Sequence, residues 1–374
     1  MYYGPNYGQG LCVQKIAEEL SKNNQVHVIH SQKGFMKNKK NLFHHFLDAG
    51  NTAGIDFIRF KYKINKTFNE LNKKNNFDLI YGNSFESLGA IEGLSVPFYY
   101  HARGTVKGNA LNRPKSFFLW EIARIPFIKL FEKWDKECCM KAKKIFVPSR
   151  QVEREIIEYY NAQEKKIEII PDGVDFGHFS KKTSQKNFRK KLGLEKNKVI
   201  LFAGRIVPQK GLQFLVEAMP LVLLKMPEAK LLVAGESTSG NYLNEIRHKI
   251  RQFGIENDVI FAGYVGQKNM PEAIASADLV ISPSTYEPFG IINLEAIAMQ
   301  KKLLVSELTA TKNLFNGCAQ YFNPYNPEEI AEKTLKLLNS RKKINAKKCK
   351  ELCRKCSWKN IGKQLHKIFE NGLK

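Results

Sequence analysis

The chain has 374 residues, which is too long for one ordinary α/β core and indicates two domains of about 170–200 residues each. Hydrophobic residues make up 43% of the sequence and aromatic residues 11%, which excludes a disordered chain. Sixty Lys and Arg residues against 36 Asp and Glu residues give a net charge of +24, which suits anionic partners, although a Lys-rich solvated surface explains it equally well.

A glycine-rich turn opens the chain, in the sequence MYYGPNYGQGLCVQKIAEEL. A Rossmann-like domain places such a turn after its first strand, and nothing before Met1 can supply that strand. We therefore expect the first strand of the N-terminal domain to be missing. We also expect the natural start codon to lie about 8–12 residues upstream.

Strand-like runs alternate with amphipathic helix-like stretches along the rest of the chain, for example the stretches 11–23 and 212–226. This alternation predicts an α/β fold with parallel sheets and helices on both faces, arranged as two Rossmann-like domains. The polar stretch 176–197 separates two series of strands and is the expected interdomain connection. The expected strands are 25–31, 56–60, 77–83, 97–102, 144–149 and 166–171 in the first series, and 198–204, 229–235, 259–263, 279–284 and 301–307 in the second.

Two readings remain open for the aromatic and basic segment 114–134. It lies in the membrane interface, or it is a buried crossover helix. No apolar run approaches the ~20 residues that span a bilayer, and no signal-peptide pattern opens the chain. We expect a cytoplasmic protein, with peripheral binding at the inner face of the cytoplasmic membrane as the first alternative. The tail 341–374, with 12 basic and 2 acidic residues, would add to such binding.

Three of the seven cysteines, Cys349, Cys353 and Cys356, share a C-x3-C-x2-C spacing. Radical S-adenosylmethionine enzymes bind an iron–sulfur cluster with this spacing, but only 18 residues follow Cys356, too few for the barrel of those enzymes. The three positions also share one face of a helix, so we interpret them as small buried core residues. The odd number of cysteines argues against a disulfide framework.

The turn after the expected strand 198–204 reads AGRIVPQKGLQFL and places Arg205 and Lys210 beside a helix that begins near Gly211. Open α/β sheets bind ligands beyond the carboxyl ends of their strands. Two cations beside a helix N-terminus make a diphosphate site there. An ordinary basic surface turn has the same composition, so this turn alone is a weak signal.

Residues 284–297 read STYEPFGIINLEAI, with Glu287 in a turn after a strand and Glu295 in the following helix. The two carboxylates either flank a buried segment at the surface or converge on a polar ligand. Carboxylates accept hydrogen bonds from vicinal hydroxyls, which suits a sugar at one end and a ribose at the other. The backbone N–H groups of Phe289, Gly290 and Ile291 would face the same ligand, and glycine allows close approach.

Together these motifs resemble a retaining glycosyltransferase of family 4, with the two-domain GT-B fold. The matching segments are GPNYGQG, FYYHARGT, KIFVPSRQVEREI, IEIIPDGVD, FAGRIVPQKG, EAKLLVAGE, VIFAGYVGQKNMPEAIASADLVISPSTYEPFGIINLEA and SWKNI. The resemblance implies two Rossmann-like domains that face each other across a cleft. It implies an acceptor-side domain at 1–175, a linker at 176–197, a nucleotide-sugar domain at 198–355 and a C-terminal helix at 356–374 that packs back on the N-terminal domain.

The resemblance also implies a role for each matching residue. Arg205 and Lys210 would hold the donor diphosphate, Glu287 the hydroxyls of the donor sugar, and His101 would lie near the acceptor. These four are the expected catalytic residues, and His101 could instead be a satisfied core histidine. The expected donor-binding residues are Gly8, which closes over the diphosphate, Val265, which contacts the base through its backbone, Phe289, Gly290 and Ile291, which contact sugar and phosphate, and Glu295, which binds the ribose.

The expected reaction transfers a hexose, with retention, from a UDP- or GDP-linked sugar to a glycan or lipid-linked acceptor in cell-envelope polysaccharide or lipopolysaccharide-type synthesis. No cofactor and no metal ion are expected, because no Asp-x-Asp pair stands where it could hold one. An epimerase or hydrolase acting on a nucleotide sugar and an inactive truncated homologue are the alternatives. A nucleic-acid-binding protein would leave these motifs unexplained, so we expect no nucleic acid partner.

The sequence departs from the resembled family in two places. Gln300, Lys301 and Lys302 occupy a stretch where the family has G-x-P before a strand. Thr309, Ala310 and Asn313 stand where the family has a glycine pair followed by a glutamate. The second change alters a loop near the expected sugar site, so the identity of the donor sugar stays open.

Overall fold

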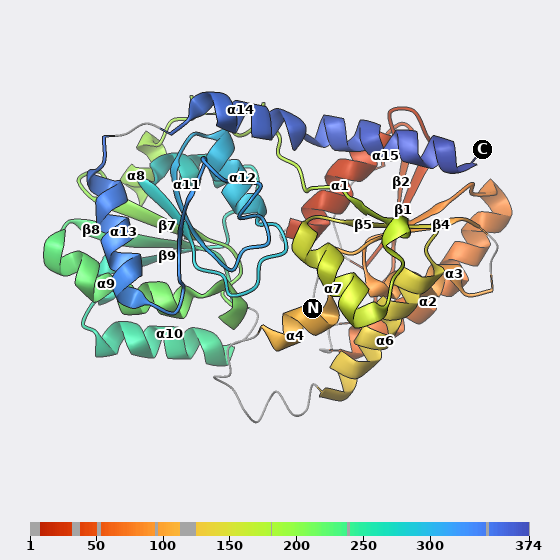
Figure 1. Ribbon diagram of the computed structural model, residues 1–374, viewed down its shortest axis with the longest axis horizontal. Coiled ribbons are helices and arrows are strands. Elements are labelled where there is room, and N and C mark those ends of the chain that lie inside the picture. Colours follow the sequence, from red (N-terminus) through yellow and green to blue (C-terminus); the bar gives the residue numbers. More distant parts are fainter. Residues whose placement is uncertain are drawn as a thin grey trace. The chain divides into compact units, whose positions relative to one another are not determined.

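The chain divides into two compact units, which are described separately (Figure 1). The first unit comprises Met1–Leu111, Lys115–Asp172 and Trp358–Lys374, and the second comprises Asn112–Pro114 and Gly173–Ser357. The computed structural model describes residues 8–31, 38–50, 54–93, 96–112, 125–180, 182–237, 240–341 and 344–373.

Two parallel sheets form the first unit in its described part. One is the two-stranded pair β1-β2, and the other has the order β3-β4-β5-β6. No described strand joins the two sheets. The strands are β1 (Val26–His30), β2 (Leu42–Phe46), β3 (Ile80–Gly82), β4 (Phe98–His101), β5 (Lys144–Val147) and β6 (Ile167–Ile169).

Helices cover these sheets with apolar faces. The helices are α1 (Gly8–Leu20), α2 (Ile55–Asn75), α3 (Leu88–Ile91), α4 (Val106–Leu111), α6 (Ile125–Lys141), α7 (Arg150–Tyr160) and α15 (Trp358–Leu373). The C-terminal helix α15 packs against α1, and Gly362 of α15 lies where a β-carbon would be 2.5 Å from Cβ of Glu19. Glycine at this position therefore allows the first and last helices of the unit to approach closely.

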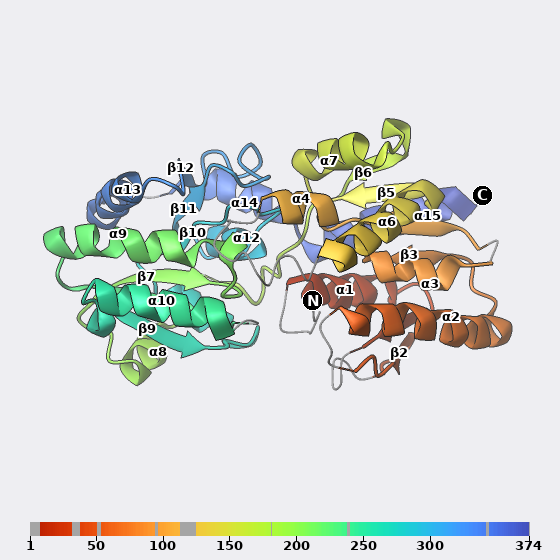
Figure 2. The same cartoon turned by 90° about the horizontal axis from the view of Figure 1, so that it is seen from below.

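The second unit contains one parallel six-stranded sheet with the order β12-β11-β10-β7-β8-β9. Its strands are β7 (Lys198–Ala203), β8 (Ala229–Ala234), β9 (Val259–Gly263), β10 (Leu279–Ser282), β11 (Lys302–Ser306) and β12 (Gln320–Phe322). Its helices are α8 (Lys186–Lys191), α9 (Leu212–Lys225), α10 (Gly240–Gln252), α11 (Met270–Ser276), α12 (Ile291–Ala298), α13 (Pro327–Asn339) and α14 (Ala346–Lys355). Helices α9 and α13 lie side by side in both views (Figures 1 and 2).

The prediction of a strand at 56–60 is wrong, because these residues belong to the 21-residue helix α2. Phe57, Ile64 and Phe68 are buried along one side of this helix, seven and four positions apart. That helical spacing only becomes visible over several turns, and a window of five residues hides it. Strands β2 and β12 were not predicted.

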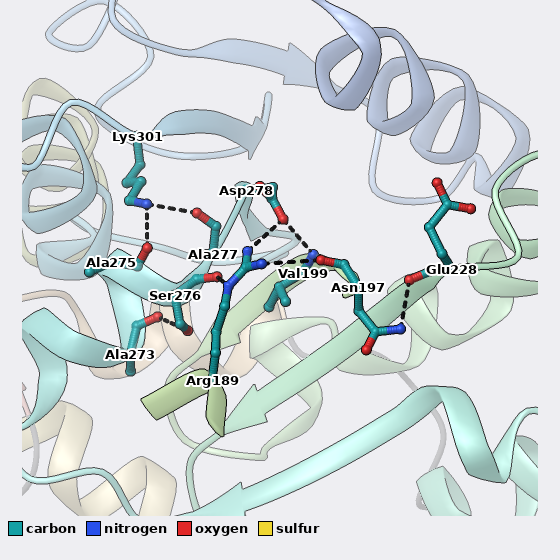
Figure 3. Close-up of polar contacts among 10 residues, drawn as sticks. All are labelled: Arg189, Asn197, Val199, Glu228, Ala273, Ala275, Ser276, Ala277, Asp278 and Lys301. Carbon is teal, nitrogen blue, oxygen red and sulfur yellow. Dashed lines mark hydrogen bonds and ion pairs between the residues drawn. The ribbon is translucent and has the colours of Figure 1, made fainter. Parts of the chain in front are cut away.

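The stretch 176–197 was predicted to be a connection between domains, but in the structure it belongs to the second unit. Phe179 and Leu194 are fully buried in the core of that unit. Arg189 of α8 donates hydrogen bonds to the backbone oxygens of Ser276 and Asn197 and forms an ion pair with Asp278 at 2.8 Å (Figure 3). A polar composition therefore does not mark this stretch as a free linker.

The segment 114–134 is described only from residue 125 onward, where it forms the start of α6. Phe131 and Trp134 are buried in the core of the first unit, which agrees with the buried-helix reading for this part. In the parts of the chain that the structure describes, no helix combines the length and the apolar character that crossing a membrane requires.

The cysteine prediction is confirmed. Cys349 and Cys353 lie on the buried face of α14, and Cys356 is buried at its C-terminal end. The three thiols pack in the hydrophobic core of the second unit together with Cys318.

Candidate active site

The carboxyl ends of β7 and β10 form the point in the second unit where the strand order reverses. From β7 the sheet continues through β8 and β9 in one direction and through β10, β11 and β12 in the other. Loops that follow the two central strands diverge at such a point, and ligands bind in the crevice between them. The turn with Arg205 and Lys210 follows β7, and the turn with Glu287 follows β10.

Gly211 allows these two loops to meet. It has φ 74°, and a β-carbon there would lie 1.9 Å from the backbone oxygen of Pro283. Any other residue would collide with the backbone of the second loop. Gly211 is also the N-cap of the 14-residue helix α9, whose N-terminus therefore begins at the meeting point.

Lys210 and Glu287 form an ion pair at this point. The distance from Nζ of Lys210 to Oε2 of Glu287 is 2.5 Å, and the hydroxyl of Ser284 donates to the same carboxylate oxygen at 3.3 Å. Glu287 is 7% exposed, so this carboxylate has lost most of its contact with water. The structure thus brings together two side chains for which the resemblance implies adjacent parts of one donor: Lys210 for the diphosphate and Glu287 for the sugar.

Glu295 lies further along α12 and has a different partner. Its carboxyl group is 4% exposed and accepts a hydrogen bond of 2.8 Å from the side-chain amide of Gln267. Burial raises the pKa of Glu295 to about 8, and the bond from Gln267 offsets part of this increase. His178 binds the backbone oxygen of Gln267 through Nε2 at 2.7 Å, which fixes the loop that presents this amide.

Between the two glutamates, the chain turns into α12 at Phe289, Gly290 and Ile291. Gly290 has φ 86° and is the N-cap of α12, which begins at Ile291. A β-carbon at Gly290 would lie 2.5 Å from the side-chain nitrogen of Asn293, so glycine is required here. The backbone oxygen of Phe289 accepts a hydrogen bond from the buried hydroxyl of Thr311 at 2.8 Å.

The loop in which Thr309 and Ala310 replace the glycines of the resembled family packs directly on this site. Thr309 pairs with Glu287 in a parallel bridge, and the backbone N–H of Ala310 donates to the backbone oxygen of Glu287 at 3.0 Å. Thr309 and Thr311 are both buried, and their hydroxyl oxygens are 3.1 Å apart. The loop around Thr309 is therefore held by the backbone hydrogen bond to Glu287 and by the contact between the two threonine hydroxyls.

Of the remaining predicted donor residues, two lie after strands of the second unit and one lies in the first unit. Arg205 is half-buried after the end of β7, and Val265 packs at the edge of the core after β9. Gly8 is the exposed first residue of α1 in the first unit. The rest of its turn, residues 1–7, lies outside the described residues.

His101 is part of the core of the first unit. It is fully buried at the end of β4, its Nδ1 lies 2.6 Å from the hydroxyl oxygen of Tyr81, and its ring lies against Phe146. Burial holds the pKa of His101 well below its usual value, and the nearby Arg103 lowers it further, so the imidazole is neutral. Among the described residues, its Nε2 has no hydrogen-bond partner.

Sequence reasoning missed four side chains of the second-unit site. Ser284 and Gln267 hydrogen-bond the two glutamates, Thr311 holds the Phe289 backbone, and Asn293 packs behind Gly290. Only Asn293 and Ser284 lie inside the segment 284–297 that the sequence singled out, and the available signal for Asn293 was a polar residue among the apolar residues Ile291, Ile292 and Leu294.

The fold defines the class of this protein. Two Rossmann-like units with parallel sheets constitute the GT-B architecture, and solved structures of this class match nearly the whole chain. Sucrose-phosphate synthase from Thermosynechococcus elongatus matches with a TM-score of 0.82 at 17% identity, covering 97% of this chain and 93% of that one. WaaG, a glycosyltransferase involved in lipopolysaccharide biosynthesis, matches with a TM-score of 0.77 at 18% identity, covering 99% and 98%.

Family comparisons then place the sequence. Residues 7–178 match the model for Glycosyltransferase Family 4, and residues 184–356 match the model for Glycosyl transferases group 1. The chain therefore belongs to the group 1 glycosyltransferases of the family 4 type.

Curated relatives agree with this assignment but match only part of their own length. An uncharacterized glycosyltransferase of Methanocaldococcus jannaschii is 32% identical over 60% of this chain and 59% of its own. The mannosylfructose-phosphate synthase of Agrobacterium fabrum is 29% identical over 58% and 50%, and the alpha-monoglucosyldiacylglycerol synthase of Streptococcus pneumoniae 27% identical over 61% and 52%. The matched regions thus span between half and three fifths of these relatives.

Proposed function

We propose that this protein transfers a hexose from a nucleotide diphosphate sugar to a hydroxyl group of a glycan or lipid-linked acceptor. The observation that carries the proposal is the Lys210–Glu287 ion pair at the reversal point of the second-unit sheet. One hydrogen bond thus joins the ammonium of Lys210, which suits a diphosphate, to the carboxylate of Glu287, which suits sugar hydroxyls.

Departure of the diphosphate leaves positive character on the anomeric carbon and negative charge on the leaving group. The proposal assigns stabilisation of the leaving group to Arg205, Lys210 and the N-terminus of α9, which starts directly after Gly211. These groups supply the charge that a metal ion would otherwise provide, so the proposed reaction is metal-independent. Retention of the anomeric configuration and a UDP- or GDP-linked donor are parts of the same proposal.

Glu295 is the proposed ribose-binding group. A carboxyl group whose pKa is near 8 is largely protonated at neutral pH and can donate one hydrogen bond as well as accept others. That pattern complements two vicinal hydroxyls, each of which is both a donor and an acceptor. Gln267 provides the protein's own partner for the same carboxyl group.

On the acceptor side, the proposal places the acceptor near Nε2 of His101. This ring nitrogen has no partner among the described residues. The nearby Arg103 forms an ion pair with Asp172 and donates to the side-chain oxygen of Asn83 at 3.1 Å. These bonds fix the end of β4 and the loop after it.

An anionic membrane surface is the proposed location of a lipid-linked acceptor. Helix α14 buries its cysteine face and exposes Lys347, Lys348, Lys350, Arg354 and Lys355, with Glu351 as the only exposed acidic residue of that helix. Such a face attracts anionic phospholipid. Flotation with vesicles of phosphatidylglycerol and phosphatidylcholine at low salt tests this, and protein that stays in the dense fraction contradicts it.

The donor site is tested with a panel of UDP- and GDP-linked hexoses by thermal shift and titration calorimetry. We expect one nucleotide series to raise Tm, and Lys210→Ala to remove the shift. Lys249→Ala is the matched control, because Lys249 forms an ion pair of 2.5 Å with Glu217 away from the site. If no member of the panel raises Tm, the proposed donor site is wrong. Release of free sugar without an acceptor would favour a hydrolase.

A further inference from the structure

Asn293 is a fully buried polar side chain whose hydrogen-bonding groups are unused. Its exposure is 0%, and among the described residues neither Nδ2 nor Oδ1 has a hydrogen-bond partner. A buried amide normally makes hydrogen bonds, because burying it without them destabilises the fold. A buried amide that has no partner among the described residues therefore calls for a functional reason.

The position of Asn293 indicates that reason. The point where a β-carbon on Gly290 would lie is 2.5 Å from Nδ2 of Asn293 and 3.2 Å from Cγ of Glu287. The amide of Asn293 and the side chain of Glu287 therefore both border the space that Gly290 leaves open. Asn293 is in the first turn of α12, which has φ 86° at its N-cap Gly290.

The carboxylate of Glu287 has two partners among the described residues, and both bind the same oxygen. Lys210 and Ser284 donate to Oε2. In the proposed reaction, Lys210 binds the donor diphosphate, and a diphosphate with its greater negative charge competes with Glu287 for that ammonium. Once Lys210 turns to the phosphates, a buried carboxylate needs a replacement donor to keep its orientation.

We propose that Asn293 is the positioning residue that holds Glu287 once Lys210 has turned to the donor diphosphate. Its Nδ2 donates to the Glu287 carboxylate and leaves the other carboxylate oxygen directed at the sugar hydroxyls. Asn293 acts through Glu287 and does not contact the sugar. This inference rests on the proposed function, because it requires a nucleotide diphosphate sugar at Lys210.

The test compares two ligands on the full chain by titration calorimetry: the nucleotide diphosphate sugar that the panel identifies, and the same nucleoside diphosphate without sugar. In Asn293→Leu, a near-isosteric apolar change, we expect affinity for the nucleotide sugar to fall about tenfold, since one hydrogen bond to a charged group is lost. Affinity for the nucleoside diphosphate should stay within about twofold. A purely structural role would change both affinities together or neither.

Stability without ligand provides a second readout. Replacing an unsatisfied amide with an apolar side chain of the same size should raise Tm of Asn293→Leu by about 2–4 °C. Thr334→Val is the matched control, because the hydroxyl of Thr334 in α13 is also fully buried without a partner among the described residues. Thr334→Val should raise Tm without changing the affinity for either ligand. Asn293→Ala removes the amide without adding volume, and the same ligand split is expected in it.

The outcomes separate the two proposals. If the wild-type protein binds the nucleotide sugar and both Asn293 variants bind it equally well, the role of Asn293 is wrong and the proposed function stands. If both ligands weaken in parallel, Asn293 is structural and the inference is also overturned. If the wild-type protein binds no nucleotide sugar, the proposed function is wrong, and the inference about Asn293 is wrong as well because it depends on that function.

Discussion

The ammonium of Lys210 and the carboxylate of Glu287 form an ion pair of 2.5 Å, although 77 residues separate them in the sequence. They meet because β7 and β10 are neighbours at the centre of the sheet, with Leu279 of β10 paired to Ile200 of β7. Parallel strands end at the same edge, so the turns that follow them lie together.

This ion pair predicts non-additive kinetics. Lys210→Ala and Glu287→Gln should each lower the turnover of sugar transfer by about 10²-fold, because each removes a charged group that the proposed function places beside the reacting bonds. Side chains in direct contact do not act independently, so the double variant should lose much less than the product of the two effects. Steady-state kcat and KM for the identified donor measure this. Full additivity would show that the two residues serve separate functions.

Glu295 predicts a pH-dependent stability. Its pKa is about 8 in the folded protein, against 4.5 for an ordinary glutamate, so between these values the folded state holds the proton more tightly than the unfolded state. Its contribution is fully present below about pH 4.5 and is lost as pH rises through about 8. The free energy of unfolding of the wild type should therefore fall by about 1–3 kcal/mol from pH 5 to pH 8 relative to Glu295→Gln. Urea unfolding at four pH values measures the difference, and parallel curves would contradict it.

Lys301 predicts the opposite trend at higher pH. Its ammonium donates to the backbone oxygens of Ala275 and Ala277 at 2.6 and 2.8 Å, at the C-terminal end of α11 (Figure 3). Burial is the main cause that lowers the pKa of Lys301 to about 8, and the nearby Arg189 adds to it. Between about pH 8 and 10.5 the unfolded state binds the extra proton, so stability rises with pH over this window.

Lys301→Met removes this titration. The wild type should gain about 1–2 kcal/mol of unfolding free energy relative to Lys301→Met between pH 8 and pH 10. Urea unfolding at both pH values measures the gain, and the comparison with the variant cancels the titration of other groups. A constant difference between the two proteins would show that the Lys301 pKa is not lowered by burial.

Gln300 predicts a stabilising substitution. It has φ 56°, in the left-handed region, at the end of α12, where the N–H of Lys301 donates to the backbone oxygen of Ala296 at 2.9 Å. Helices commonly end in this way with glycine, which adopts the conformation without steric cost. Gln300→Gly should raise the unfolding free energy by about 0.5–1 kcal/mol.

Asn161→Gly is the control for this substitution, because Asn161 has φ 58° and asparagine tolerates the left-handed region better than glutamine. Chemical denaturation should show a smaller gain there. An equal or larger gain at Asn161 would indicate that backbone strain at Gln300 is not what limits stability.

Short sequence patterns predicted most of the strands. The predictions failed where the pattern extends over several helical turns, or where a strand depends on a neighbouring strand to pair with. The strand predicted at 56–60 is part of α2, whose apolar face is visible only over several turns. Strand β2 was not predicted; it contains His44 and His45, and Nε2 of His45 is 2.9 Å from Nδ1 of His27 in β1. Polar residues form such a strand only because a neighbouring strand is present to pair with it.

The sequence alone determined the alternation of strands and helices and the positions of the two motifs, because both depend on residues near one another in the chain. Spacing and resemblance predicted that Arg205, Lys210, Glu287 and Glu295 belong to one site, and this stays a prediction. Tertiary structure decided that Lys210 pairs with Glu287, that Gln267 pairs with Glu295, and that Asn293 is buried with no partner in the described part of the chain. Hydrogen bonds and burial are set by chain segments far apart in the sequence, so only the folded sheet brings these groups within reach of one another.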